Sequence, residues 1–167
     1  MDLKTNGTKT WPFVLRALEP LRSKGYLSHV KDDQFVKGPV TVIGTGNAPL
    51  ADIKAKQDRD AFYDGPLNNL DSDDIDALIS PIASVSFKKL FGPVKDGEKF
   101  LNSTNIDELR KHIKAAHGKD ILARYWDLPK YPIGLRNQIW QIMMDEGVDL
   151  LNVDDLADAA GFWEMNE

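Results

Sequence analysis

Two charged residues near the start of the sequence, Asp2 and Lys4, have the types and the spacing for metal or phosphate chemistry. Residues two apart in a strand point to the same side, so both charges are expected on one face. There the carboxylate can hold a hard cation, and the ammonium group can meet a phosphate. A surface ion pair is the other interpretation of the same pattern.

Further polar residues occur where short apolar runs end. Strands are expected over 40–43, 61–64, 83–87, 121–126 and 148–153. The polar groups at their carboxyl ends that we select as candidate substrate-binding residues are Asn47, Asp64, Arg124 and Asn152. Ligands bind at this edge of parallel α/β sheets, which favours a binding role. Helix capping and turn formation are the alternative, and for Asn47 capping is the favoured one.

Helical periodicity separates these strands. Apolar residues recur at helical spacing over 11–21, 105–117 and 135–146, and Asp154 or Asp155 is expected to cap a last helix running through Trp163. Strand followed by helix, repeated along the chain, predicts an α/β fold with a parallel sheet. The 167 residues, 42% of them hydrophobic, are expected to form one domain over 1–167.

Composition excludes several classes of function. The chain has 21 basic and 26 acidic residues, a net charge of -5, and no cysteine. We therefore expect no nucleic-acid partner, no disulfide and no thiol catalysis. The sequence contains neither the apolar core of a signal peptide nor a run long enough for a transmembrane segment. The sequence therefore does not indicate the cellular compartment of the protein.

Histidine chemistry is not expected from this sequence. His29 is predicted in a loop, and His112 and His117 lie five residues apart on one helix, which places them on different faces. The turn Gly44–Asn47 could offer backbone amides to a phosphate, but it lacks the third glycine of a dinucleotide-binding motif. A tight strand-to-helix turn is the favoured interpretation of these residues.

Several segments together carry a family resemblance. They are Asp2-Leu3-Lys4-Thr5, residues 40–47, Phe62-Tyr63-Asp64-Gly65-Pro66-Leu67, Arg124-Tyr125-Trp126-Asp127-Leu128-Pro129, 136–140, 147–149 and 152–156. With them the chain resembles the phospholipase-C-like phosphodiesterase superfamily. Within it, the chain is similar to a fungal group related to glycerophosphodiester phosphodiesterases and sphingomyelinase-D-like phospholipases.

The resemblance implies an incomplete TIM-type (β/α) barrel of about six strand-helix units, the C-terminal part of the family's barrel without its first two units. It implies a Mg²⁺-dependent hydrolase of lipid metabolism that cleaves glycerophosphodiesters or lysophospholipids. By its motifs, Asp2 is a metal ligand, Lys4 contacts the phosphate, Trp126 lines the cleft and Asn152 closes the last strand. The family's paired catalytic histidines have no match here, so the chain is expected to be inactive alone.

Three other expectations accompany this one. A non-catalytic module that binds phosphate or phospholipid, or serves assembly, is the alternative function, and a nucleotide-binding enzyme that uses Gly44–Asn47 is a weaker one. An incomplete barrel leaves two open sheet edges, which predicts homodimerisation through them.

Overall fold

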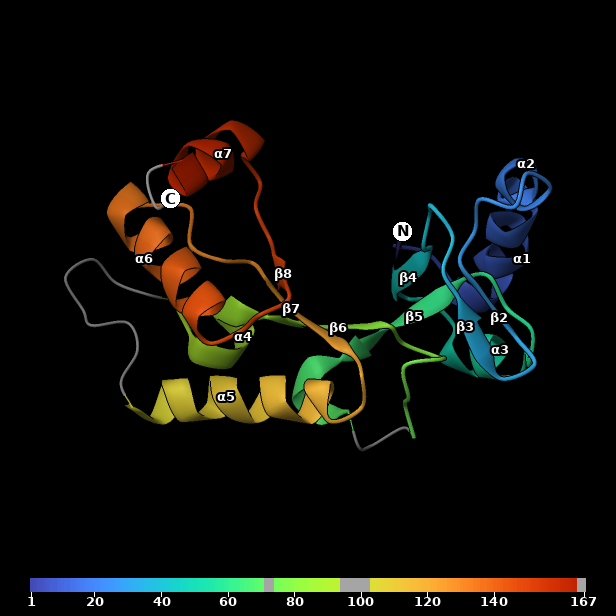
Figure 1. The fold of residues 1–167 in the computed structure, drawn as a ribbon, viewed down its shortest axis with the longest axis horizontal. Helices are drawn as coiled ribbons and strands as arrows, with labels where there is room; N and C mark the ends of the chain where they lie inside the picture. Colours follow the sequence, from blue (N-terminus) through green and yellow to red (C-terminus); the bar gives the residue numbers. More distant parts are fainter. Residues whose placement is uncertain (71–73, 94–102, 165–167) are drawn as a thin grey trace. The chain divides into compact units, whose positions relative to one another are not determined.

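The computed structural model describes residues 1–70, 74–93 and 103–164, in which strands and helices alternate (Figure 1). A six-stranded parallel sheet has the order β1-β4-β5-β6-β7-β8. Its strands are β1 (Asp2–Leu3), β4 (Ile43–Gly46), β5 (Phe62–Pro66), β6 (Ile82–Ser86), β7 (Leu122–Trp126) and β8 (Leu150–Leu151). This confirms the predicted α/β class and is consistent with an incomplete TIM-like barrel.

The chain divides into two compact units, which are described separately. The first consists of Met1–Gly65, Leu70–Ile82 and Lys119–Ile121, and the second of Pro66–Asn69, Ala83–Gly118 and Leu122–Glu167. None of the helices in the described residues is long and apolar enough to cross a membrane.

Helices α1 (Gly7–Ala17), α2 (Glu19–Arg22) and α3 (Leu50–Lys54) belong to the first unit. The helix predicted over 11–21 begins earlier, because Asn6 caps α1 by accepting a hydrogen bond from the Lys9 amide at 3.0 Å. Helix α1 ends at Ala17, and Leu18 separates it from α2, which begins at Glu19. Gly7 is required where α1 starts, since a Cβ atom there would lie 1.6 Å from the carbonyl oxygen of Asn47.

One face of the first unit's strands packs against α1. Leu3 and Trp11 belong to the same buried cluster, and a Cβ atom on Gly44 would lie 3.0 Å from the Trp11 ring. Leu3 and Gly44 therefore face α1. Because side chains alternate along a strand, the neighbouring positions Asp2 and Thr45 face the other side of the sheet.

The structure corrects two predictions in this unit. The strand expected over 40–43 begins only at Ile43, because Val40 instead bridges to Leu27, with the Ser28 amide donating to the Val40 carbonyl at 2.7 Å. His29, expected in a loop, begins β2 (His29–Lys31), which pairs antiparallel with β3 (Gln34–Val36). Neither this hairpin nor the short helix α3 was predicted from the sequence.

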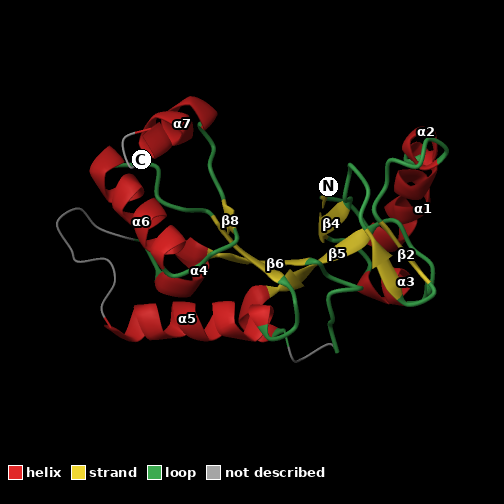
Figure 2. Cartoon of the chain, viewed as in Figure 1, coloured by secondary structure: helices red, strands yellow, loops and turns green. Residues whose placement is uncertain are grey.

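The second unit contains the 3₁₀ turn η1 (Leu67–Asn69) and helices α4 (Phe87–Phe91), α5 (Ser103–His117), α6 (Ile133–Asp145) and α7 (Leu156–Glu164) (Figure 2). The helices predicted over 105–117 and 135–146 are confirmed as α5 and α6. Asp155 caps α7 as predicted, since its carboxylate accepts from the amides of Ala157 and Asp158.

Helix α5 packs on β7 through a polar contact that the periodicity did not predict. His112 is buried, and its Nδ1 atom lies 3.2 Å from the hydroxyl of Tyr125, which is only 1% exposed. Burial lowers the pKa of His112 and raises that of Tyr125, because both charged forms lose hydration. Tyr125 therefore faces α5, and its neighbours Arg124 and Trp126 face away from it.

We expect the free energy of unfolding to decrease as the pH falls below 6.5, the ordinary pKa of histidine. The unfolded chain then takes up a proton at this position before the folded chain does, which favours unfolding. Above pH 6.5 the effect is absent. Urea unfolding of the wild type and of His112→Gln between pH 5 and pH 8 measures it, and an equally steep pH dependence in the variant would contradict the assignment to His112.

Candidate functional site

A row of polar side chains crosses the first unit on the sheet face turned away from α1. Asp2 pairs with Thr45 across β1 and β4, and Gly44 pairs with Tyr63 across β4 and β5. Extending this register by one residue places Asp64 beside Thr45. Asp2, Thr45 and Asp64 thus share one row, and all three point to the same side of the sheet.

Asp2 and Lys4 meet at the carboxyl end of β1. The Lys4 ammonium nitrogen lies 2.5 Å from Asp2 Oδ2, and the side chains are 81% and 47% exposed, respectively. At this exposure an ion pair contributes only about 0–1 kcal/mol to stability. Both groups remain accessible to a ligand. The structure thus places side by side the two residues that were selected from the sequence.

The turn after β4 is fixed by backbone pairing. The amides of Thr45 and Asn47 donate to the carbonyl oxygens of Met1 and Leu3 at 2.9 and 2.8 Å. These amides are used inside the sheet, which argues against a phosphate-binding loop of the nucleotide-binding type. The Asn47 side-chain amide also donates to the Thr5 carbonyl at 3.0 Å, so Asn47 holds the segment that carries Lys4.

The second unit carries its own polar group on the sheet face turned away from α5. Arg124 donates from Nη1 to the Ser84 hydroxyl at 3.3 Å and from Nη2 to Oδ1 of Asn152. Its guanidinium is half-buried, and no acidic partner is found for it in the described residues. The arginine is therefore held in place by neutral groups and keeps a full positive charge for an anion.

Trp126 follows Arg124 on the same face and is 39% exposed, which leaves ring surface for a ligand. Asn152 also lines a cleft of about 190 Å³ between the segments after β7 and β8, with Lys130, Tyr131 and Arg136 among its other lining residues, whereas Arg124 and Trp126 do not line it. Arg124 and Asn152 were both selected from the sequence, but neither their contact with each other nor the place of Asn152 in this cleft was predicted. These two residues are 28 positions apart in the sequence, so no local sequence pattern indicates their contact.

The carboxylate of Asp2 is the acidic group of this pair that a cation could reach. In the part of the chain that the structure describes, no three acidic or histidine side chains gather to hold a metal ion. Mg²⁺ commonly uses one or two carboxylates and completes its shell with waters and substrate oxygens. The exposed carboxylate of Asp2 fits one such position, and Lys4 beside it fits a phosphate oxygen.

Similarity to known proteins covers the segment that carries this pair. Residues 1–64 match the model of the AIM6-like phosphodiesterase domain. The chain is also 48% identical over 165 residues to the "Altered inheritance of mitochondria protein 6 homolog" of Arthroderma benhamiae, covering 98% of this chain and 52% of that protein.

Two further relatives are more distant. The "Altered inheritance of mitochondria protein 6" of Eremothecium gossypii is 32% identical over 93% of this chain and 43% of its own length. That of Saccharomyces cerevisiae strain YJM789 is 34% identical over 81% of this chain and 39% of its own length. The chain thus spans about half the length, or less, of these relatives. No solved structure matches the chain.

Together, the matched domain and these relatives show that the chain is similar to phosphodiesterase-like proteins. These comparisons do not show the narrower group, related to glycerophosphodiester phosphodiesterases and sphingomyelinase-D-like phospholipases, that the sequence resembles.

Proposed function

We propose that this chain is the C-terminal part of a Mg²⁺-dependent phosphodiesterase barrel that cleaves glycerophosphodiesters or lysophospholipids. The observation that carries the proposal is the Asp2–Lys4 pair, which lies at the carboxyl end of β1 and within the match to the phosphodiesterase domain. An exposed carboxylate beside an exposed ammonium group offers one position for a cation and one for a phosphate oxygen.

Each polar group has a separate role in this proposal. Asp2 supplies a carboxylate ligand to Mg²⁺, which neutralises phosphate charge when bound. Lys4 contacts a phosphate oxygen, and Asp64, on the same face of the first unit, orients the substrate. In the second unit, Arg124 is positioned by Ser84 and Asn152 and binds an anionic oxygen, and the partly exposed Trp126 ring on the same face contacts the substrate.

Cleavage of a phosphodiester also needs a nucleophile or base and an acid. All three histidines are described: His29 Nδ1 contacts the Leu27 carbonyl oxygen at 3.2 Å, His112 is buried against Tyr125, and His117 Nε2 contacts Asp149 at 2.8 Å. None of them lies on the polar sheet faces described above. We therefore propose that these 167 residues supply charge stabilisation but not proton transfer, and that alone they are inactive.

A chimera tests the proposal directly. In it, this chain replaces the matching segment of the Arthroderma benhamiae relative, and that relative itself is assayed in parallel. We expect the chimera to release glycerol or choline from glycerophosphodiesters and lysophospholipids, but not to cleave cyclic nucleotides, and we expect the isolated chain to release neither. Robust turnover by the isolated chain would contradict the inactivity, and no turnover by either longer protein would contradict the activity.

A non-catalytic module that binds phosphate or phospholipid is the second candidate. The unpaired charge of Arg124 favours it, because an arginine held by neutral groups binds anions whether or not they react. Calorimetric binding of a lysophospholipid, with no turnover in the chimera, would select this alternative.

A further inference from the structure

A pocket of about 460 Å³ opens in the first unit, away from the polar row that contains Asp2. Asp60 and Ala61, which line it, directly precede β5, so the pocket lies at the amino end of that strand. Asp64 lies further along the same strand, toward its carboxyl end. The volume falls within the range of about 300–1,000 Å³ typical of small-molecule sites.

Apolar side chains from four parts of the first unit form the walls. They come from α1, from β2 and the residues just before it, from α3, and from the residue just before β5. These residues are Trp11, Leu15, Leu27, Val30, Ile53 and Ala61. All except Leu15 are less than 5% exposed. An apolar group that enters the pocket therefore meets side chains that are already fixed by the core.

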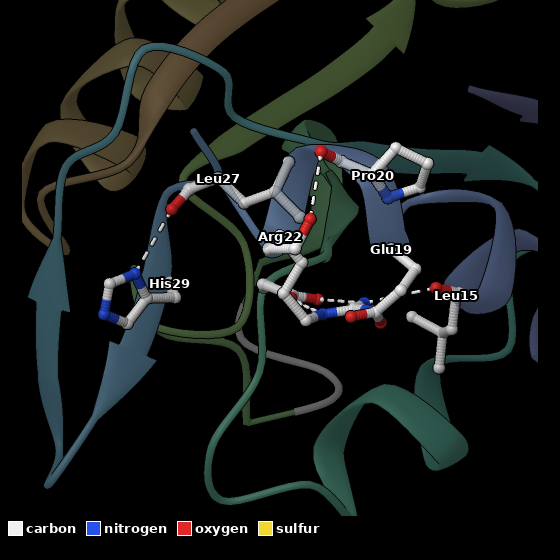
Figure 3. Close-up of polar contacts among 8 residues, drawn as sticks. Leu15, Glu19, Pro20, Arg22, Leu27 and His29 are labelled. Atoms are coloured by element: carbon white, nitrogen blue, oxygen red, sulfur yellow. Dashed lines mark hydrogen bonds and ion pairs between the residues drawn. The ribbon is translucent and has the colours of Figure 1, made fainter. Parts of the chain in front are cut away.

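One wall carries a fixed ionic group. Arg22 donates from Nη1 to Glu19 at 2.5 Å, from Nη2 to the Leu15 carbonyl at 3.2 Å and from Nη2 to Asp60 at 3.1 Å. Figure 3 shows Arg22 beside Glu19 and Leu15, and the His29 ring turned toward the carbonyl oxygen of Leu27. The two acids neutralise Arg22, so this group holds the wall in shape rather than attracting a ligand.

Three other cations on the lining have no such neutralisation. Lys31 and Lys56 are exposed and make no ion pair with the described residues. Arg59 donates to the carbonyl oxygens of Lys56 and Leu78 at 2.7 and 2.8 Å, which are neutral acceptors. Against these three charges only Asp58 remains as an acidic lining residue without a partner. The charged side chains that line the pocket are therefore net positive, on a chain whose net charge is -5.

We propose that this pocket binds a small organic anion that combines an apolar body with one carboxylate or phosphate group. The apolar body packs on the wall that contains Trp11, and the anionic group lies at the rim with Lys31 and Lys56. Neither part of this recognition depends on the proposed phosphodiesterase activity, because the pocket and the Asp2–Lys4 pair share no residue.

Nuclear magnetic resonance of the ¹⁵N-labelled chain tests the proposal. Trp11 is one of four tryptophans, and its indole N–H signal can be assigned from a Trp11→Phe variant. We expect octanoate and hexyl phosphate to shift this signal saturably. Octanol and inorganic phosphate, which each lack one half of the ligand, are expected to bind at least about tenfold more weakly.

Charge reversal at the rim is the decisive comparison. Lys31→Glu with Lys56→Glu should weaken octanoate binding by about tenfold or more. The matched control, Lys9→Glu with Lys37→Glu, changes two exposed lysines of the same unit outside the pocket and should leave the affinity within about twofold. All four lysines are exposed, so both variants are expected to fold.

Three outcomes would overturn the proposal. They are no saturable shift of the Trp11 signal, equal affinity of the two double variants, and binding of octanol as tight as that of octanoate. If the Trp11 signal shows no saturable shift, the pocket does not bind such an anion and could instead hold another group, such as a segment of a longer chain.

Discussion

Replacing Arg124 by methionine is expected to lower kcat/KM for phosphodiester cleavage by about 100-fold or more in the chimera. The side chain has the apolar reach of arginine but loses the charge that Ser84 and Asn152 hold in place. A positioned cation stabilises the phosphate oxygens more in the transition state than in the ground state, so most of the loss should fall on kcat. Steady-state kinetics with a lysophospholipid measures it.

Two variants separate this effect from a loss of structure. Arg124→Lys keeps the charge but lacks the guanidinium that donates to both Ser84 and Asn152, so it should recover only part of the activity. Arg110→Met removes an exposed arginine of the same unit, one that pairs with Glu146 at 2.6 Å, and should leave kcat/KM unchanged. Equal activity of Arg124→Met and Arg110→Met would remove Arg124 from the site.

Replacing Asp2 by asparagine should have an effect of similar size and should also raise the Mg²⁺ concentration needed for half-maximal activity. The amide keeps the shape of the side chain but removes the negative charge that attracts the cation. Because Asp2 is exposed, its ion pair with Lys4 contributes little to stability, and the melting temperature should not change. Activity at increasing Mg²⁺ concentration, with calorimetric melting, measures both.

Asp33→Asn is the matched control for this variant. Asp33 is an exposed acid of the same unit in the turn between β2 and β3, where its positive φ of 57° is well tolerated by asparagine. We expect Asp33→Asn to keep wild-type Mg²⁺ dependence. If Asp2→Asn also keeps it, Asp2 does not hold the cation.

Lys4→Met should lower activity without altering the Mg²⁺ requirement.

Alternation along single strands was sufficient to predict which residues share a sheet face. It placed Asp2 with Lys4, and the structure shows them in contact. The strand around Arg124 was equally clear, because its buried alternate residues, Ala123 and Tyr125, leave only one face for the polar ones. These local patterns depend on side-chain direction, which the backbone of a strand determines.

Contacts between distant segments could not be predicted in the same way. Residues 40–43 have the composition of a strand, but Val40 pairs with Leu27, so the sheet strand starts later. His112 looked like one polar residue on a helix, and only the packing of α5 on β7 shows its contact with Tyr125. The pocket lined by Lys31 and Lys56 combines segments between residues 11 and 61 and has no sequence motif.

The most direct test of the central claim is phosphodiester hydrolysis by the chimera, followed by ³¹P nuclear magnetic resonance with Mg²⁺ and with a chelator. We predict hydrolysis in Mg²⁺, loss of hydrolysis with the chelator, and loss in the Asp2→Asn and Arg124→Met variants. Hydrolysis that persists with the chelator, or that both variants retain at the wild-type rate, would contradict the claim that this chain supplies the charged part of a Mg²⁺-dependent phosphodiesterase site.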